Sequence, residues 1–458
     1  MEVPQSIGMR TSCRVSDGCW RPFRRAADRY LAAALLALST SSEALVYRAT
    51  PENYGPMVSA LRPGDMLMLS PGEYRDGLAV HDLVGKPQRP IMITGPERGA
   101  PAVFVAREHH NTVSIVDSAY VVIRNLALEG HGLPVDAVKA EGHSHWAHHV
   151  TLEHLVIRGH GNNQQTVGIS TKCPAWNWVL RGNAIFGAGT GMYLGNSDGN
   201  APFVAGLIER NVIVDTIGYN LQIKHQNPRP DLGGIPRGRS TTIIRHNVFA
   251  KTKGDSVDEA RPNVLVGHLP LSGPGVEDDY VIYGNFFYQN PHEALFQGEG
   301  NVALYSNLFY NEYRDAIRIQ PHNDIPRRIT VAYNTVLAGG IGISLIRNEG
   351  VQSFRQVVAA NAVFSDLGIA GGTQIGNVTA PLAEARTFLR RPFASLGVLD
   401  LSPQKDWPAA AANKQIPVES FPDWTKDFDG RTRSPGSIGA YNGRESRSRW
   451  LPQLEPKP

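Results

Sequence analysis

The stretch VIYGNFFYQNPHEALFQGEGNVALYSNLFY, residues 281–310, decides the fold because it contains the same short pattern twice. In each copy a β-branched or aromatic run leads to an asparagine, Asn285 or Asn307, and an apolar pair follows. The two asparagines are 22 residues apart, and a turn with one further apolar run fills the interval. A repeat of this length made of short strands indicates one coil of a β-solenoid.

The same pattern continues through most of the chain. The shared position recurs at Asn125, His154, Asn183, Asn211, Asn247, Asn285, Asn307, Asn334 and Asn361. By subtraction, the intervals are 29, 29, 28, 36, 38, 22, 27 and 27 residues. These periods predict an all-β solenoid in which each coil adds one strand to each of its sheets. A side-chain amide at a bend can bond to its counterpart one coil away and tolerates a left-handed backbone, so we expect a buried asparagine ladder.

Two other parts of the chain carry a resemblance to a known family. LRPGDMLMLSPGEYRDGLAV, residues 61–80, is followed by GKPQRPIMITG, residues 85–95, and DFDGRTRSPGSIGAYNG occupies residues 427–443. The first two resemble the opening coils of the alginate lyase and chondroitinase B group of polysaccharide lyases, and the third resembles the closing segment of many secreted β-helix proteins. The resemblance implies a right-handed parallel β-helix over residues 45–400, with loop insertions in the central coils, and a C-terminal closing segment and tail over residues 401–458.

The N-terminus is typical of an export signal. Several arginines precede the apolar run LAAALLAL, residues 31–38, and Ser42 and Ala44 take the small-residue positions of a signal-peptidase site. We therefore expect residues 1–44 to be a signal peptide and the mature protein to be secreted or periplasmic. The apolar run is too short to cross a bilayer, so no membrane span is predicted.

Composition limits the class of partner. The formal net charge of +3 over 458 residues is too small to indicate nucleic acid binding but allows a local basic groove. Two of the three cysteines lie within the expected signal peptide, so Cys173 remains alone and no intramolecular disulfide is expected. We expect a monomer.

One face of the solenoid is predicted to carry the functional side chains. Side chains alternate along the strand that follows each repeated asparagine, with Val138, Ile169, Leu221 and Ile317 expected to point inward. The outward set is then Lys139, Glu141, Ser170, Lys172, Tyr193, Gln222, Lys224, Gln297, Arg318 and Gln320. The two longest coils add insertions at residues 225–240 and 251–262, and residues 269–279 extend the second, so the candidate cleft lies near Lys224.

A basic outward face suits β-elimination at a uronate of an acidic polysaccharide. That reaction needs a cation on the carboxylate, a base for the C5 proton and an acid near the leaving oxygen. We expect Lys224 to be the base, because positive neighbours lower the pKa of a lysine toward neutrality. The other expected catalytic residues are His225, His268 and Arg318, and the expected substrate-binding residues are Lys172, Tyr193, Gln222, Arg229, Arg261, Gln297 and Gln320.

The family resemblance also implies a catalytic pair and calcium ligands. In the lyase group a catalytic lysine ends one strand and an arginine, often followed by a histidine, ends the next; Lys224 is similar to that lysine. Gly267 stands where the arginine is expected, and TIGYN, residues 216–220, lacks the carboxylates that bind calcium in the group. We therefore expect no metal site and no cofactor, with calcium left open.

Two other functional classes stay open. Glycoside hydrolysis needs two opposed carboxyl groups, which Asp258 and Glu299 could supply. A non-catalytic carbohydrate-binding or envelope structural protein would keep the repeat and the insertions without a converging base. The histidine-rich stretches at residues 107–111 and 141–149 are interpreted as surface or stacking histidines rather than as a metal site.

Overall fold

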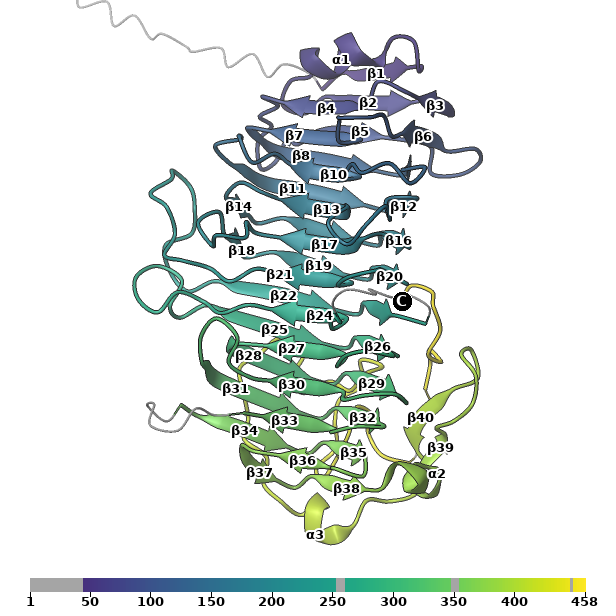
Figure 1. The fold of residues 1–458 in the computed structure, drawn as a ribbon, viewed down its shortest axis with the longest axis vertical. Helices are drawn as coiled ribbons and strands as arrows, with labels where there is room; N and C mark the ends of the chain where they lie inside the picture. The colour runs from purple at the N-terminus through teal and green to yellow at the C-terminus, as the bar shows by residue number, and fades with distance from the viewer. Residues whose placement is uncertain (1–43, 253–259, 347–353, 445–447) are drawn as a thin grey trace, which may run out of the picture. The chain divides into compact units, whose positions relative to one another are not determined.

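The computed structural model describes residues 44–252, 260–346, 354–444 and 448–458. In this part of the chain successive coils stack, and the strands cycle through three sheets that we name I, II and III (Figure 1). Within the described residues the strand pairings of these three sheets are parallel, so each strand bonds to its counterparts in the coils before and after it. The predicted parallel β-helix is confirmed.

The strands of each sheet follow one another in chain order. Sheet I comprises β1 (Val46–Ala49), β2 (Met66–Leu69), β5 (Ile91–Thr94), β8 (Ser118–Arg124), β11 (Ala147–Glu153), β15 (Val179–Arg181), β19 (Leu207–Glu209), β22 (Thr241–Arg245), β25 (Asp279–Tyr283), β28 (Gly300–Tyr305), β31 (Pro326–Ala332), β34 (Gln356–Ala359) and β37 (Thr373–Ile375), with β14 (Ala175–Trp176) and β18 (Phe203–Val204) extending it. Sheet II comprises β3 (Gly72–Tyr74), β6 (Ala102–Val105), β9 (Leu126–Glu129), β12 (Val156–Arg158), β16 (Ala184–Phe186), β20 (Val212–Val214), β23 (Val248–Ala250), β26 (Phe286–Tyr288), β29 (Leu308–Asn311), β32 (Thr335–Ala338), β35 (Ala362–Phe364) and β38 (Val378–Ala380). Sheet III comprises β4 (Leu78–His81), β7 (Val113–Val116), β10 (Val138–Ala140), β13 (Val167–Thr171), β17 (Thr190–Leu194), β21 (Leu221–Ile223), β24 (Val264–Val266), β27 (Phe296–Gly298), β30 (Ile317–Ile319), β33 (Ile343–Leu345) and β36 (Ile369–Ala370).

Short elements cover the two ends of the stack. Helix α1 (Tyr54–Ala60) packs on the first coils through buried Tyr54 and Val58. The sheet strands end at Ala380, earlier than the predicted boundary at residue 400. The segment beyond them contains a 3₁₀ turn (Leu382–Glu384), α2 (Ala385–Phe388), β39 (Leu389–Arg391), β40 (Asp400–Pro403) and α3 (Ala409–Ala412).

The C-terminal segment returns along the outer face of sheet II (Figure 1). Val212, Val248 and Phe286 are outward residues of that sheet, and they form one buried cluster with Phe428 and Trp450 from the segment. Burying this second apolar face removes it from water and stabilises the later coils. The C-terminal segment also packs on the outer face of sheet I, where Trp424 lies in a buried cluster with Val281 and Tyr283, so it covers two sheets of the later coils.

The asparagine ladder is confirmed from Asn183 to Asn361, and it continues to Asn377. At Asn285 the backbone N–H and the side-chain Nδ2 both donate to Oδ1 of Asn307, each at 3.0 Å. The same two bonds recur at the neighbouring rungs, where the asparagine side chains are buried. The amide thus satisfies backbone groups at a corner where the sheet bonds stop.

Two predicted rungs and one predicted conformation are wrong. Asn125 and His154 lie one position earlier than the ladder, because the N–H of Leu155 is the group that donates to Asn183 Oδ1. Both have left-handed backbones, with φ of 56° and 53°. In the later coils the residue before the rung, such as His246, takes this conformation, and the rung asparagine does not.

Two sequence predictions concern membranes and export. No helix in the described ranges is long and apolar enough to cross a membrane. Residues 1–43 of the predicted signal peptide lie outside the described part of the chain, so the export signal stays a prediction.

Candidate active site

Sheet III presents two rows of outward side chains. The first row runs through Ser170, Tyr193 and Gln222, which pair across neighbouring strands. The second row lies just beyond the strand ends and runs through Lys172, Gly195, Lys224, Gly267, Glu299 and Gln320, as their backbone bonds to the preceding coil show. Val138, Ile169, Leu221 and Ile317 are fully buried on the opposite face, so the predicted inward and outward sets are confirmed.

A polar cavity of about 220 Å³ lies over these rows. Five of the predicted site residues line it: Lys172, Tyr193, Gln222, Lys224 and Arg261. The other lining residues are Gln164, Gln165, Val167, Thr190, Tyr219 and His322. The cavity therefore brings together one arginine and two lysines, and none of its described lining residues carries a carboxylate.

The aromatic ring of Tyr193 lies between the two lysines. The Nζ atom of Lys172 is 3.3 Å from the ring centroid, and that of Lys224 is 5.9 Å from it. An ammonium group over a tyrosine ring is attracted by the negative face of the ring. Gly195 occupies the row position between the lysines, so no side chain stands between them in that row.

Arg261 approaches from the second insertion. Its guanidinium lies 5.5 Å from the centroid of Tyr219, and its Nε donates to Oε1 of Gln164 at 3.5 Å. Gln164 belongs to the turn before β13, so the bond joins segments 97 residues apart. The planar guanidinium can bind a carboxylate through two parallel hydrogen bonds.

The cavity lowers the pKa of both lysines. Burial, followed by the charges of Lys139 and Lys224, lowers the pKa of Lys172 to about 8, although the Asp136 carboxylate acts in the opposite direction. Burial and then the charge of Arg261 lower the pKa of Lys224. Burial raises the pKa of Tyr193, so its phenol stays protonated at neutral pH. A lysine that loses its proton more readily and a protonated phenol are suited to act as base and acid.

The glycine at position 267 is required by close backbone packing. A Cβ atom there would lie 2.4 Å from the backbone nitrogen of His225 and 2.8 Å from the carbonyl carbon of Lys224. The row position therefore cannot accommodate the arginine that the lyase group carries at this place.

We expect Gly267→Ala to destabilise the protein by about 1–3 kcal/mol, because the strand end carrying Lys224 must shift. Thermal and denaturant unfolding measure the change. Gly233→Ala is the matched control in the neighbouring insertion, where a Cβ would meet nothing within 4 Å. Equal stability of the two variants would contradict the close packing at Gly267.

The two predicted histidines lie beside the cavity rather than in its lining. The rings of His225 and His268 stack with centroids 5.2 Å apart and planes inclined by 17°. Nδ1 of His268 is 3.1 Å from the backbone oxygen of Leu269. Burial lowers the pKa of His225, and the charge of Lys224 contributes. Their expected role as assisting acids stays a prediction.

Three predicted site residues lie further along sheet III. Arg318 pairs with Gln297 in the sheet register, and its guanidinium lies 3.6 Å from Asp315 and 3.9 Å from Glu293. Gln320 follows it in the second row. They do not line the described cavity, and the carboxylates already compensate the charge of Arg318. Arg318 is thus not in the cavity that Lys224 lines, and its expected catalytic role stays a prediction.

Arg229 is a correction to the predicted substrate-binding set. Its side chain is 1% exposed, and its guanidinium forms an ion pair with Asp278 and donates to the backbone oxygen of Pro236. Burial and pairing leave it no access to a ligand. The residue instead fixes the insertion at residues 225–240 against the loop before β25.

Glu299 is a correction to the alternative acid and base pair. It is 1% exposed, and its Oε2 accepts the backbone N–H groups of His322, Asn323 and Asp324 at 3.2, 2.9 and 2.7 Å. A carboxylate used in this way anchors a loop. Asp258, its predicted partner, lies outside the described residues.

The histidine-rich stretch at residues 141–149 forms stacks, as interpreted from the sequence. His148 stacks on Trp176 and His149 on Tyr120, with centroids 4.4 and 4.3 Å apart. His145 is 2.8 Å from Asp117. Within the described ranges no three His, Cys, Asp or Glu side chains are grouped to hold a metal ion.

These observations define a parallel β-helix with a basic cavity on one sheet. No family model and no curated protein matches the chain. Similar solved structures include an alginate lyase from Paenibacillus sp. str. FPU-7, at 17% identity and a TM-score of 0.44, covering 74% of this chain and 96% of that one. Pectate lyase Pel9A is similar at 13% identity and a TM-score of 0.42, covering 88% and 97%. GH136 lacto-N-biosidase from Eubacterium ramulus is similar at 10% identity and a TM-score of 0.37, covering 74% and 68%.

Proposed function

We propose that this protein is a polysaccharide lyase that cleaves an acidic polysaccharide by β-elimination at a uronate. The observation that supports this most is the cavity lining: Lys172, Lys224 and Arg261 converge there with Tyr193, and no described lining residue is acidic. Such a lining attracts a carboxylate-bearing ligand. It does not supply the two carboxyl groups that glycoside hydrolysis requires.

The elimination step assigns one task to each group. Arg261 binds the carboxylate of the uronate and so makes the C5 proton more acidic. Neutral Lys224 removes that proton, the C5–H electron pair forms the C4=C5 double bond, and the bond from C4 to the glycosidic oxygen breaks. Tyr193 donates its phenolic proton to the leaving oxygen. The adjacent Lys172 ammonium stabilises the phenolate that remains.

The test is to incubate the mature protein with a panel of polyuronates and glycosaminoglycans. Ultraviolet absorbance of unsaturated uronate ends is followed together with a reducing-sugar assay. We expect both signals to rise together on at least one polymer. Reducing ends without absorbance would replace elimination by hydrolysis, and binding without either signal would replace the enzyme by a carbohydrate-binding module.

The pH profile tests the pairing of Arg261 with Lys224. Because the charge of Arg261 lowers the pKa of Lys224, Arg261→Gln raises that pKa. Lys224 must be unprotonated to act, so activity increases as pH rises through its pKa, and the acidic limb of kcat/KM moves to higher pH in the variant. Loss of the guanidinium also raises KM.

Arg239→Gln serves as the control, since Arg239 pairs with Asp279 in the insertion and does not line the cavity. We expect its pH profile to match that of the wild type. An unchanged acidic limb in Arg261→Gln would exclude Arg261 as the group that tunes the base.

A further inference from the structure

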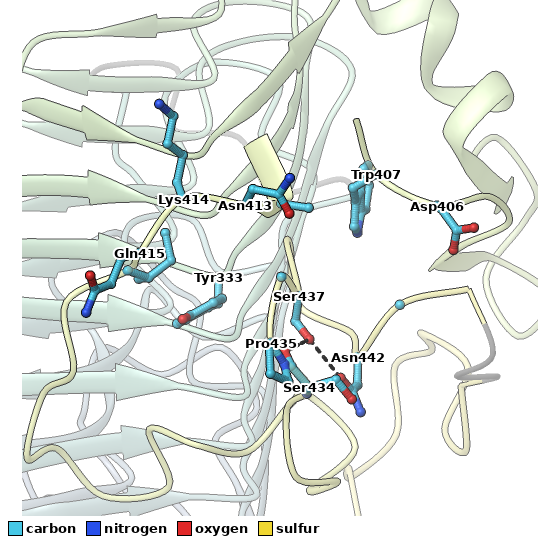
Figure 2. A pocket seen from close by; sticks show the side chains of 14 residues that line it. Tyr333, Asp406, Trp407, Asn413, Lys414, Gln415, Ser434, Pro435, Ser437 and Asn442 are labelled. Atoms are coloured by element: carbon cyan, nitrogen blue, oxygen red, sulfur yellow. Dashed lines mark hydrogen bonds between the residues drawn. The ribbon is translucent and has the colours of Figure 1, made fainter. Parts of the chain in front are cut away.

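A larger cavity of about 660 Å³ lies in the C-terminal segment (Figure 2). One side is formed by Asn413, Lys414 and Gln415 and the other by residues 434–437, with Tyr333 and Trp407 also in the lining. Tyr333 is the corner residue between β31 and β32, where sheet I passes to sheet II. The candidate active site lies on sheet III, so the two cavities belong to different faces of the coils.

One side of this cavity is pre-organised. The backbone N–H of Ser434 and the hydroxyl of Ser437 both donate to Oδ1 of Asn442, at 2.6 and 2.7 Å. Nδ2 of Asn442 donates to the backbone oxygen of Thr432 at 2.8 Å. These bonds fix the turn at residues 434–437 before any ligand arrives, which reduces the entropy lost on binding.

The other side offers free polar groups. The side chains of Asn413, Lys414 and Gln415 make no hydrogen bond or ion pair with the described part of the chain. Trp407 is 9% exposed, and its buried indole N–H has no acceptor among the described residues. Buried donors in native proteins are normally satisfied, so this N–H is a candidate donor to a ligand oxygen.

The charges favour an anionic ligand. Asp406, the acidic residue of the described lining, lies with its Oδ1 3.3 Å from Nε of Arg444. Lys414 has no such partner in the part of the chain that the structure describes, so it places one uncompensated cation at the edge of the cavity. A single ammonium group matches a single carboxylate per sugar better than a polyphosphate, which would call for several cations.

We propose that this cavity is a second carbohydrate-binding site, which takes an acidic oligosaccharide. Amide, hydroxyl and indole groups can exchange hydrogen bonds with sugar hydroxyls, Lys414 can bind a uronate carboxylate, and the cavity volume falls within the range of about 300–1,000 Å³ usual for small-ligand sites. The site does not depend on the cleavage chemistry proposed for sheet III. When both sites bind one polymer, the second raises the effective concentration of substrate at the first.

Isothermal titration tests the proposal with hexasaccharides of galacturonate, guluronate, mannuronate and glucuronate, and with neutral cellohexaose and maltohexaose. The protein carries Lys224→Ala so that cleavage during the titration is slowed. We expect at least one acidic hexasaccharide to bind and both neutral ones to bind at least about tenfold more weakly. Adding Lys414→Ala with Gln415→Ala should weaken that binding at least about tenfold, and Trp407→Phe should weaken it while keeping an aromatic ring.

Lys86→Ala is the control, because Lys86 is an exposed lysine near the N-terminal end of the solenoid. Thermal unfolding checks that each variant is folded. Binding that is unchanged in the Lys414 and Gln415 variant, or absent from the parent protein, overturns the second site. If the second site fails this test but the wild type cleaves polymer, the lyase proposal stands. If binding depends on Lys414 but the wild type cleaves no polymer, the lyase proposal is wrong and the second site stands.

Discussion

Replacing Lys224 with alanine is expected to lower kcat/KM for elimination by about 10²–10⁴-fold, the usual contribution of a positioned general base. The reason is geometric as well as chemical, since Lys224 lies in the same cavity as Arg261 and Tyr193. Burial and the Arg261 charge make its neutral form more accessible than that of an exposed lysine. Initial rates of absorbance increase on the best polymer of the panel provide the measurement.

Lys172→Ala distinguishes between the two lysines of the cavity. Lys172 is proposed to stabilise the Tyr193 phenolate, so Lys172→Ala should lower kcat/KM less than Lys224→Ala does. Lys86→Ala, far along the chain, should retain wild-type activity. If Lys172→Ala proves the more damaging of the two, the base is Lys172, and full activity in Lys224→Ala would remove Lys224 from the mechanism.

Asn285→Ala is expected to destabilise the protein by about 4 kcal/mol or more, the largest stability effect anticipated for a single side chain. The substitution removes the acceptor of two bonds from Asn247 and three donor bonds to Asn307, Ile244 and Tyr283. Each buried group left without a partner costs about 1–3 kcal/mol. Chemical denaturation, with circular dichroism as the signal, measures the loss.

The control for this ladder prediction is Asn323→Ala. Asn323 is exposed, and among the described residues its one hydrogen bond runs from its backbone N–H to Glu299. That variant should unfold within about 0.5 kcal/mol of the wild type. A similarly small loss in Asn285→Ala would mean that the ladder satisfies backbone groups without contributing net stability.

The fold could be predicted from the sequence because most coils repeat the same pattern of an apolar run, an asparagine and a second apolar run. The repeat interval gives the length of each coil, and the alternation of Ile169 and Ser170 shows which side chains of a strand point inward and which outward. The buried asparagines mark the corner between sheets I and II. The alignment failed at Asn125 and His154, because the ladder position is a leucine in both coils, Leu126 and Leu155, and the residue before it is polar. When the ladder asparagine is absent from a coil, the repeat interval alone cannot distinguish the ladder position from the residue before it.

Most of the candidate site was predictable where it lies on strands or directly after them, and Arg261 was expected from the second insertion. Lys172, Tyr193 and Lys224 were found because strand alternation fixes their direction. Gln164 and His322 come from turns, and no pattern in the sequence indicates that they reach the same cavity. Arg229 was misassigned because a basic loop looks alike in sequence whether its arginine faces solvent or pairs with Asp278, which is 49 residues away.

The contacts that stabilise the solenoid in addition to its interior core differ between its early and its late coils. The ladder begins at Asn183, and the C-terminal segment packs on sheet II from Val212 onward, whereas the earlier described coils rely on the interior core. In a quasi-one-dimensional stack, such a difference sets the order in which segments open. Amide hydrogens before Asn183 should therefore exchange with solvent sooner than those of the later coils. The cavity spans that boundary, with Lys172 before it and Lys224 after it, so opening of the early coils should release one half of the site while the other half stays folded.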